Sequence, residues 1–248
     1  MINLKGLWKT YGASPTLRGV DLTVPKGTVH TIIGPSGCGK STLLRCVNLL
    51  EMPDTGQVSV DTMEFSFGPH CRKARPHDLR MLRTKAGIVF QSYDLFQNLT
   101  ALDNVALGLK VVRKWDAKRA REHAAALLEK LGLAGREHQL PRHLSGGQAQ
   151  RVAIARALAM EPSVILFDEV TAALDPELVK EVLGVLRQLT DEGYTMIVVT
   201  HEMSFARSIS HRVSFMCEGS IVESSPPEEL FQSPKDPRTR QFLSSLVH

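Results

Sequence analysis

The chain has 248 residues, which is long enough for one large domain or two modest lobes with a hydrophobic core. With 43% hydrophobic and 23% charged residues, its composition is that of a globular protein and excludes a disordered chain. The net charge of +4 is only mildly basic, and aromatic residues make up 6% with no tract that interleaves them with lysine or arginine. Nothing in the composition therefore indicates nucleic-acid binding.

No apolar run approaches the roughly 18 residues that a membrane-spanning helix requires. The first residues, MINLKGLWKTYG, lack the apolar segment of a secretory signal. We therefore expect a cytoplasmic protein, unless a partner holds it at a membrane. No CxxC spacing occurs, so we expect reduced thiols at the four cysteines, Cys38, Cys46, Cys71 and Cys217.

Residues 1–60 read as short strands separated by Gly and Pro: NLKGLWK, LRGVDLTV, GTVHTIIG and GQVSV. The strand over 28–33 runs straight into a glycine-rich loop. A helix is expected in KSTLLRCVNLL after it, closed by Pro53 and Gly56. Residues 61–86 are irregular and basic, and we expect a solvated helix and loop there.

A second apolar strand is expected over 87–91, GIVFQ, after which the chain becomes helical from about 98 to 160. The middle helical segment carries an amphipathic stripe that we expect to be a packing face: Ala124, Leu127, Leu128 and Leu131. Strands return with SVILFDE over 163–169 and TMIVVTH over 195–201, separated by a helix over about 176–190. Both strands are almost entirely apolar, as expected of a parallel sheet covered on both faces.

The end of the chain is expected to form a hairpin that turns at Glu218-Gly219, followed by two short helices after Pro226. These elements predict an α/β fold, with a mixed sheet, an antiparallel β lobe and an inserted helical subdomain. We expect a single domain over 1–248. Its parts are a catalytic core over 1–91 and 161–225, the helical subdomain over 92–160 and a helical tail over 226–248.

GPSGCGKS over 34–41 matches the phosphate-binding pattern G-x-x-x-x-G-K-[ST] and lies between an expected strand and an expected helix. Glycines allow backbone N–H groups to approach phosphate oxygens without a Cβ in the way. Lys40 would place its charge on the β- and γ-phosphates of ATP, and the Ser41 hydroxyl would bind Mg²⁺. The nucleotide-binding residues expected in this loop are Gly34, Ser36, Gly37, Cys38, Gly39, Lys40, Ser41 and Thr42.

Cys38 is a special case because it lies at a helix start, where the helix dipole favours a thiolate. We therefore expect a maleimide reagent to inhibit ATP hydrolysis by modifying Cys38, and bound ATP to protect the thiol.

The strand over 163–169 ends in two carboxylates, Asp168 and Glu169. On its own such a pair is typical of a solvated turn, but beside a phosphate loop it lies where open α/β sheets bind ligands. Asp168 would hold Mg²⁺, and Glu169 would orient and deprotonate the attacking water. Gln91 and His201 also end apolar strands, a position where a lone polar residue is often only a terminator. At the same sheet edge, Gln91 would serve Mg²⁺ or water, and His201 the γ-phosphate.

LSGGQ over 144–148 has a good N-cap in Ser145, and Gly146 and Gly147 expose N–H groups at the start of a helix. An ordinary capped helix has the same features. The segment lies in the helical part of the chain, 145 − 40 = 105 residues beyond Lys40. We therefore expect it to bind a phosphate that another copy of the chain holds.

The motifs follow one another along the chain as the phosphate loop, LSGGQ, VILFDE and VTH. In this order of motifs the chain resembles the ATP-binding subunits of ABC transporters. The resemblance implies a head-to-tail homodimer, with two ATP molecules sandwiched between the phosphate loop of one copy and LSGGQ, up to Gln148, of the other. It also implies that Tyr11, which the residues alone do not single out, stacks on adenine. Gln91 would lie in a loop that senses the membrane partner, and Asp175 at the tip of a loop that crosses the dimer interface.

The segments LSGGQAQRVAIARALAMEP and SPPEELFQSPKDPRTRQFLSSL resemble the branch of the family that takes up polar amino acids. That branch implies a peripheral protein on the cytoplasmic side of the inner membrane, with transmembrane permease subunits and, indirectly, an extracytoplasmic solute-binding protein. Permeases are expected to dock near 91–98, where Tyr93, Leu95 and Phe96 are apolar.

Two residues depart from the family pattern: Val170 stands where proline is usual, and Ala172 where serine is usual. Val170 lacks the restraint of proline on φ, which predicts a looser loop after Glu169. Other functions stay open at this point: an importer of another solute, an exporter, or an ABC ATPase that acts on DNA or ribosomes.

Overall fold

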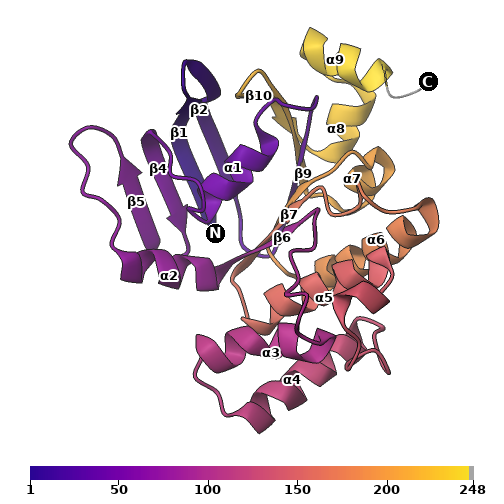
Figure 1. Cartoon of the computed structure of the whole chain (residues 1–248). Helices are drawn as coiled ribbons and strands as arrows, with labels where there is room; N and C mark the ends of the chain where they lie inside the picture. Colours follow the sequence, from indigo (N-terminus) through magenta and orange to yellow (C-terminus); the bar gives the residue numbers. More distant parts are fainter. Residues whose placement is uncertain (246–248) are drawn as a thin grey trace.

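The computed structural model describes residues 1–245, which form two β-sheets and a group of helices (Figure 1). An antiparallel sheet has the strand order β2-β1-β4-β5, and a larger sheet has the order β10-β9-β3-β8-β7-β6. The expected α/β fold, with a mixed sheet and an antiparallel lobe, is confirmed.

The antiparallel sheet is built from β1 (Ile2–Tyr11), β2 (Ser14–Val24), β4 (Thr55–Val60) and β5 (Met63–Phe67). The expectation of irregular structure over 61–86 is wrong for β5, which pairs with β4 along its whole length. β5 is an edge strand whose residues alternate between half-buried and exposed, so it has no apolar run to mark it. The helix expected in this region is present as α2 (Pro76–Lys85).

The larger sheet contains β3 (Val29–Ile33), β6 (Ala86–Phe90), β7 (Val164–Asp168), β8 (Met196–Val199), β9 (Arg212–Cys217) and β10 (Ser220–Ser225). The first five run parallel, and β10 returns antiparallel to β9 through the expected hairpin. Every residue of β3, β7 and β8 is buried, which explains their apolar sequences. Because these strands are parallel, the segments that follow them meet at one edge of the sheet.

The remaining elements are α1 (Lys40–Val47), α3 (Ala101–Val111), α4 (Ala117–Lys130), the 3₁₀ helix η1 (Pro141–His143), α5 (Gly146–Ala159), α6 (Pro176–Asp191), α7 (Met203–Ile209), α8 (Pro227–Gln232) and α9 (Pro237–Ser244). Figure 1 shows α3, α4 and α5 packed together below the sheets, away from α1. The predicted stripe of α4 is confirmed, because Ala124 and Leu128 are fully buried in this helical group and Leu127 packs against it. Among residues 1–245, no helix combines the length and apolarity needed to cross a membrane.

Candidate functional site

The glycine-rich loop joins β3 to α1, and Lys40 is the first residue of that helix. Its side chain is only 4% exposed and folds back over the loop. The ammonium donates hydrogen bonds to the carbonyl oxygens of Gly34, at 2.9 Å, and Pro35, at 3.0 Å. The loop therefore presents a fixed cation together with backbone N–H groups, which suits a phosphate ligand.

The hairpin between β9 and β10 packs directly against this loop. A Cβ at Gly34 would lie 2.1 Å from the carbonyl oxygen of Met216, and φ of Gly34 is +151°. The N–H of Gly219, in the turn, donates to the carbonyl of Cys38 at 3.1 Å. Gly34 thus has two reasons to be glycine, its backbone conformation and the close approach of β9.

Ser41 and Asp168 meet at the edge of the sheet, where the Ser41 hydroxyl donates to Asp168 Oδ1 at 2.7 Å. Asp168 is 6% exposed, and this burial raises the pKa of its carboxyl above the ordinary value. A hydroxyl and a carboxylate are hard oxygen donors, so the pair fits a magnesium ion. Over residues 1–245 no cluster of three or more His, Cys, Asp or Glu side chains is suited to a metal.

Glu169 follows β7 with a backbone φ of +50°, which is uncommon for a residue other than glycine. Its N–H donates to the carbonyl of Val199 at 3.0 Å, which anchors this strained backbone to β8. The Oε1 atom lies 3.1 Å from Nε2 of His201 and 3.8 Å from Nζ of Lys40. The structure thus brings Lys40, Glu169 and His201 together from the ends of three neighbouring strands.

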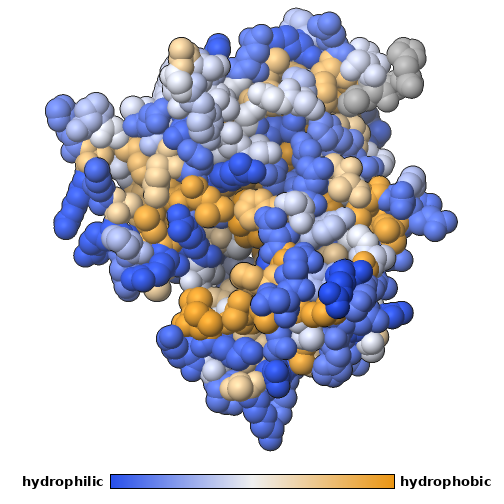
Figure 2. All heavy atoms as spheres, in the orientation of Figure 1, coloured by the Kyte–Doolittle hydropathy of each residue, from blue (hydrophilic) through white to orange (hydrophobic). Residues whose placement is uncertain are grey.

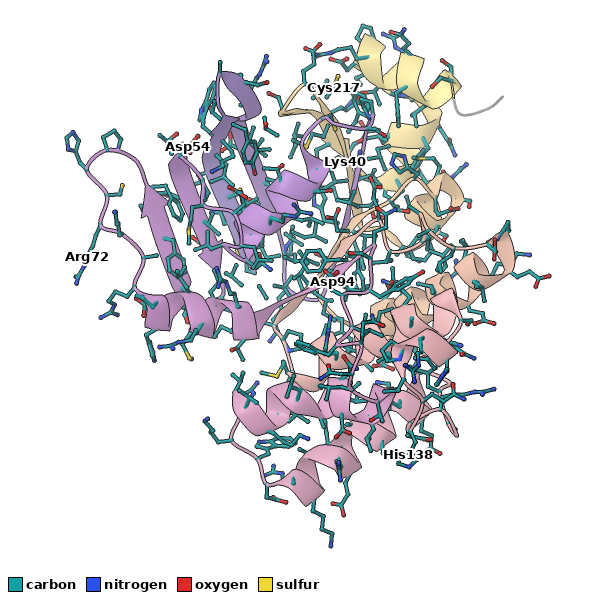
Figure 3. All side chains as sticks on the ribbon, in the orientation of Figure 1. Lys40, Asp54, Arg72, Asp94, His138 and Cys217 are labelled. Atoms are coloured by element: carbon teal, nitrogen blue, oxygen red, sulfur yellow. The ribbon has the colours of Figure 1, made fainter. Side chains whose placement is uncertain are left out.

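Gln91 is exposed directly after β6 and lines a cavity of about 650 Å³, together with Ser41 and Asp168. Asp94, on the same loop, lines this cavity as well, and Figure 3 labels it below Lys40. The sheet edge therefore holds Gln91 beside the two expected magnesium ligands. Tyr11 comes from the other sheet, at the end of β1, and is 47% exposed.

The LSGGQ segment begins α5 with a complete capping box. Ser145 Oγ accepts a hydrogen bond from the N–H of Gln148, and Gln148 Oε1 accepts one from the N–H of Ser145. A Cβ at Gly146 would come within 2.8 Å of Leu174 Cδ2 and 2.9 Å of Tyr93 Oη, and Gly147 is buried. Figure 1 shows α5, which this segment begins, in the helical group and away from α1, which the phosphate loop precedes.

Asp175 is exposed at the N-cap of α6, and its side chain makes no cap hydrogen bond. It follows the segment that contains Leu174, which contacts Gly146. Val170 is buried in the core beneath this loop. We find no structural account of Ala172 beyond its exposure.

Two expectations about individual residues are wrong. Cys38 is 7% exposed, and this burial raises the pKa of its thiol. The charge of the nearby Lys40 lowers the pKa, but by less than burial raises it. The helix dipole therefore does not produce a reactive thiolate here, because desolvation disfavours the charged form more strongly. Leu95 is also 7% exposed and belongs to the core of the helical group, so it does not form part of a docking surface.

Two residues that contact the expected site were not singled out from the sequence. Lys9 lies over the Tyr11 ring, and Glu51 forms an ion pair with Lys9. They are 51 − 9 = 42 residues apart, and neither belongs to a recognisable motif, so only the fold reveals the pair.

Comparison with known proteins places the chain beside ATP-binding proteins. A family model described as "ABC transporter" matches residues 17–172. The L-cystine import ATP-binding protein TcyC of Bacillus subtilis is 47% identical, over 100% of this chain and 99% of that protein. The arginine transport ATP-binding protein ArgV of Corynebacterium glutamicum is 48% identical, over 100% of this chain and 98% of that protein. A solved dimer of the ATP-binding cassette MJ0796, bound to ADP and Pi, superposes with a TM-score of 0.81 at 35% identity, covering 92% of this chain and 99% of that chain.

Proposed function

Because this chain belongs to the ABC transporter family, we propose that it is the ATP-hydrolysing subunit of an importer for polar amino acids. The observation that carries the activity is the meeting of Lys40, Ser41, Asp168, Glu169 and His201 at one edge of the parallel sheet. Support for the substrate class comes from relatives that are named for cystine and arginine transport and match this chain from end to end.

In this proposal, Lys40 and the N–H groups of the glycine-rich loop bind the β- and γ-phosphates of ATP. Ser41, Asp168 and Gln91 would hold magnesium, which would neutralise charge on the phosphate oxygens. Glu169 accepts a proton from the attacking water. His201, 3.1 Å from Glu169, orients that carboxylate and contacts the γ-phosphate.

The second half of each site comes from a second copy of the chain. Ser145, Gly146, Gly147 and Gln148 would contact the phosphates held by the partner's loop, and Asp175 would cross the interface. ATP then binds the closed dimer better than the open one, and this difference in affinity shifts the pair toward closure. The dimeric cassette with ADP and Pi supports this arrangement.

Transmembrane permease subunits would dock on exposed apolar side chains. Figure 2 shows apolar groups on the face that carries α1 and α3. The large hydrophobic residues exposed on the chain include Leu50, Met81, Phe96, Val111 and Val112. This arrangement makes the chain a peripheral protein on the cytoplasmic side of the membrane, indirectly served by an extracytoplasmic solute-binding protein. In the same proposal, the helices within 92–160 form a subdomain that carries a docking face, and 1–91 with 161–225 form the core. The proposed tail is 226–248, of which 246–248 lie outside the described residues.

The proposal is tested by reconstituting the chain with its permease subunits in liposomes that contain Mg-ATP. ATP-dependent accumulation of radiolabelled cystine, arginine or glutamine is the expected result. Accumulation of a solute of another class would overturn the substrate class, and export would overturn the direction. ATPase activity that depends on DNA or ribosomes, and not on permeases, would overturn the transport function itself.

A further inference from the structure

The end of β1, which carries Tyr11, is tied to the segment 51–54 that follows α1. The N–H of Asp54 donates to the carbonyl of Trp8 at 2.8 Å, and Asp54 Oδ2 accepts from the N–H of Thr10 at 2.7 Å. Since these hydrogen bonds involve the backbone of β1 just before Tyr11, they fix the point from which the tyrosine side chain extends.

Lys9 adds a buried side-chain link between the same two segments. Its ammonium lies 2.9 Å from Glu51 Oε1 and 3.7 Å from Asp54 Oδ1, and it donates to the carbonyl of Met52 at 2.9 Å. The Lys9 side chain is only 13% exposed. An ammonium has three N–H donors, and three oxygen partners surround it here, so its position is well determined.

Lys9 and Glu51 both act on the Tyr11 side chain. The Lys9 ammonium lies 5.2 Å from the centroid of the Tyr11 ring, within the range of a cation–π contact. Burial first, and then the Glu51 carboxylate, raise the pKa of the Tyr11 hydroxyl. The pKa of Glu51 lies below its ordinary value, mainly because of Lys9 and to a smaller extent because of the Tyr11 hydroxyl. The ring therefore has the Lys9 ammonium at one face, and the Glu51 carboxylate holds that ammonium in place at 2.9 Å.

Glu51 is also joined to the helix that begins at the phosphate loop. Its N–H donates to the carbonyl of Arg45 in α1, at 3.1 Å, and α1 starts with Lys40. Glu51 thus connects the helix that begins with the phosphate-binding lysine to the ammonium that lies over the Tyr11 ring.

We infer that Lys9 and Glu51 are positioning residues for the nucleotide base. They hold the Tyr11 ring with one face against the Lys9 ammonium and leave the opposite face for adenine, at a distance from the phosphate loop that α1 sets. This inference rests on the proposed function, since it requires that the loop binds ATP.

The test compares two ligands that differ in whether they carry a base. Isothermal titration calorimetry on the full chain gives the Kd for Mg-ATP and for magnesium tripolyphosphate. Stacking of a base on an aromatic ring is worth enough to change affinity about tenfold. Lys9→Met and Glu51→Gln are therefore expected to weaken ATP about tenfold and to leave tripolyphosphate unchanged. The controls are Lys5→Met and Glu64→Gln, at exposed residues of β1 and β5 that make no ion pair within residues 1–245, and both should match the wild type.

Tyr11→Ala separates the possible outcomes. Because Lys9 and Glu51 act through the ring, a Tyr11→Ala, Glu51→Gln double variant should bind ATP no more weakly than Tyr11→Ala alone. Weaker ATP binding by Tyr11→Ala with unchanged binding by both Lys9→Met and Glu51→Gln would overturn the positioning role only. Equal losses for ATP and tripolyphosphate would indicate a general structural role and overturn it too. Failure of the wild-type chain to bind ATP would instead overturn the proposed function. Glu51→Gln keeps the size of the side chain, so it decides the question even if Lys9→Met does not fold.

Discussion

The imidazole of His201 lies beside the carboxylate of Glu169, with Nε2 3.1 Å from Oε1. Lys40 approaches the same oxygen from the phosphate loop, and the positive φ of Glu169 directs this residue away from the line of β7. A carboxylate held between two nitrogen groups has little freedom to rotate. These contacts hold the Glu169 carboxylate in one orientation, which favours its use as a general base.

Glu169→Gln is expected to lower the rate of ATP hydrolysis about 10²- to 10⁴-fold and to leave ATP binding intact, because an amide has the same shape but cannot accept the proton. Without hydrolysis the ATP-bound dimer should accumulate. Phosphate release, ATP titration and gel filtration in Mg-ATP measure these three quantities. Glu122→Gln, at an exposed residue of α4, is the matched control. A Glu169→Gln protein that stays monomeric in ATP would contradict the sandwich dimer.

Leu95 and Phe96 are adjacent but should respond oppositely to aspartate. Leu95→Asp places a carboxylate in the core of the helical group and should destabilise the chain by roughly 3 kcal/mol or more. Phe96 is 49% exposed, so Phe96→Asp should fold normally but impair permease docking. Urea unfolding and transport in reconstituted liposomes check the two effects. Full transport by Phe96→Asp would argue against docking at this loop.

Maleimide labelling of the native chain at pH 7 should reach Cys71 well before Cys38. Cys71 is exposed on the loop between β5 and α2, whereas burial of Cys38 blocks the reagent and raises the pKa of its thiol. Peptide mapping by mass spectrometry after brief labelling measures both sites, and unfolding in urea should make them react alike. Rapid native labelling at Cys38 would show that the loop opens far more often than this packing implies.

His30 should make the stability depend on pH. The side chain is buried, with Nε2 2.7 Å from Ser214 Oγ, and burial, followed by the charge of Arg212, lowers the pKa of His30 to about 4. In the unfolded chain, histidine binds a proton below about pH 6.5, whereas the folded chain binds it only near pH 4. The unfolded state therefore gains protons first, and stability falls as the pH drops from about 6.5 to about 4.

Between pH 7 and pH 5 this contribution amounts to about 2 kcal/mol of unfolding free energy. Urea unfolding of wild type and His30→Gln at the two pH values measures it, since the variant lacks the titrating group. His77→Gln, at an exposed histidine, should keep the wild-type dependence. An identical pH dependence in wild type and His30→Gln would show that His30 is not the group responsible.

The parallel sheet and the loops at its edge could be predicted because each rests on a local pattern. Runs such as VILF are apolar since both faces of β7 are covered, and the glycine-rich loop carries its own signature. β5 escaped prediction because an edge strand needs no apolar run, only a partner for its backbone. Leu95 resembled an exposed apolar residue because its burial depends on helices that follow it in the chain.

The spacing of motifs along the sequence does not reveal which distant residues pack around a site residue. The dipole that acts on Cys38 comes from the helix that follows it, whereas its burial comes from β9 and the hairpin turn some 180 residues later. The ion pair of Lys9, which lies over the Tyr11 ring, with Glu51 likewise joins segments that are distant in the chain. Long-range packing of this kind determines both a pKa and the orientation of a ring.

The contact between the hairpin turn and the glycine-rich loop also bears on how the protein is made. The loop at 34–39 leaves the ribosome early, but Met216 and Gly219, which pack against it, follow much later. A growing chain therefore holds its phosphate-binding residues without the wall that shapes them, and closing so long a loop is slow. ATP therefore cannot meet a finished pocket until the hairpin turn at Gly219 has emerged, some 180 residues after the loop itself.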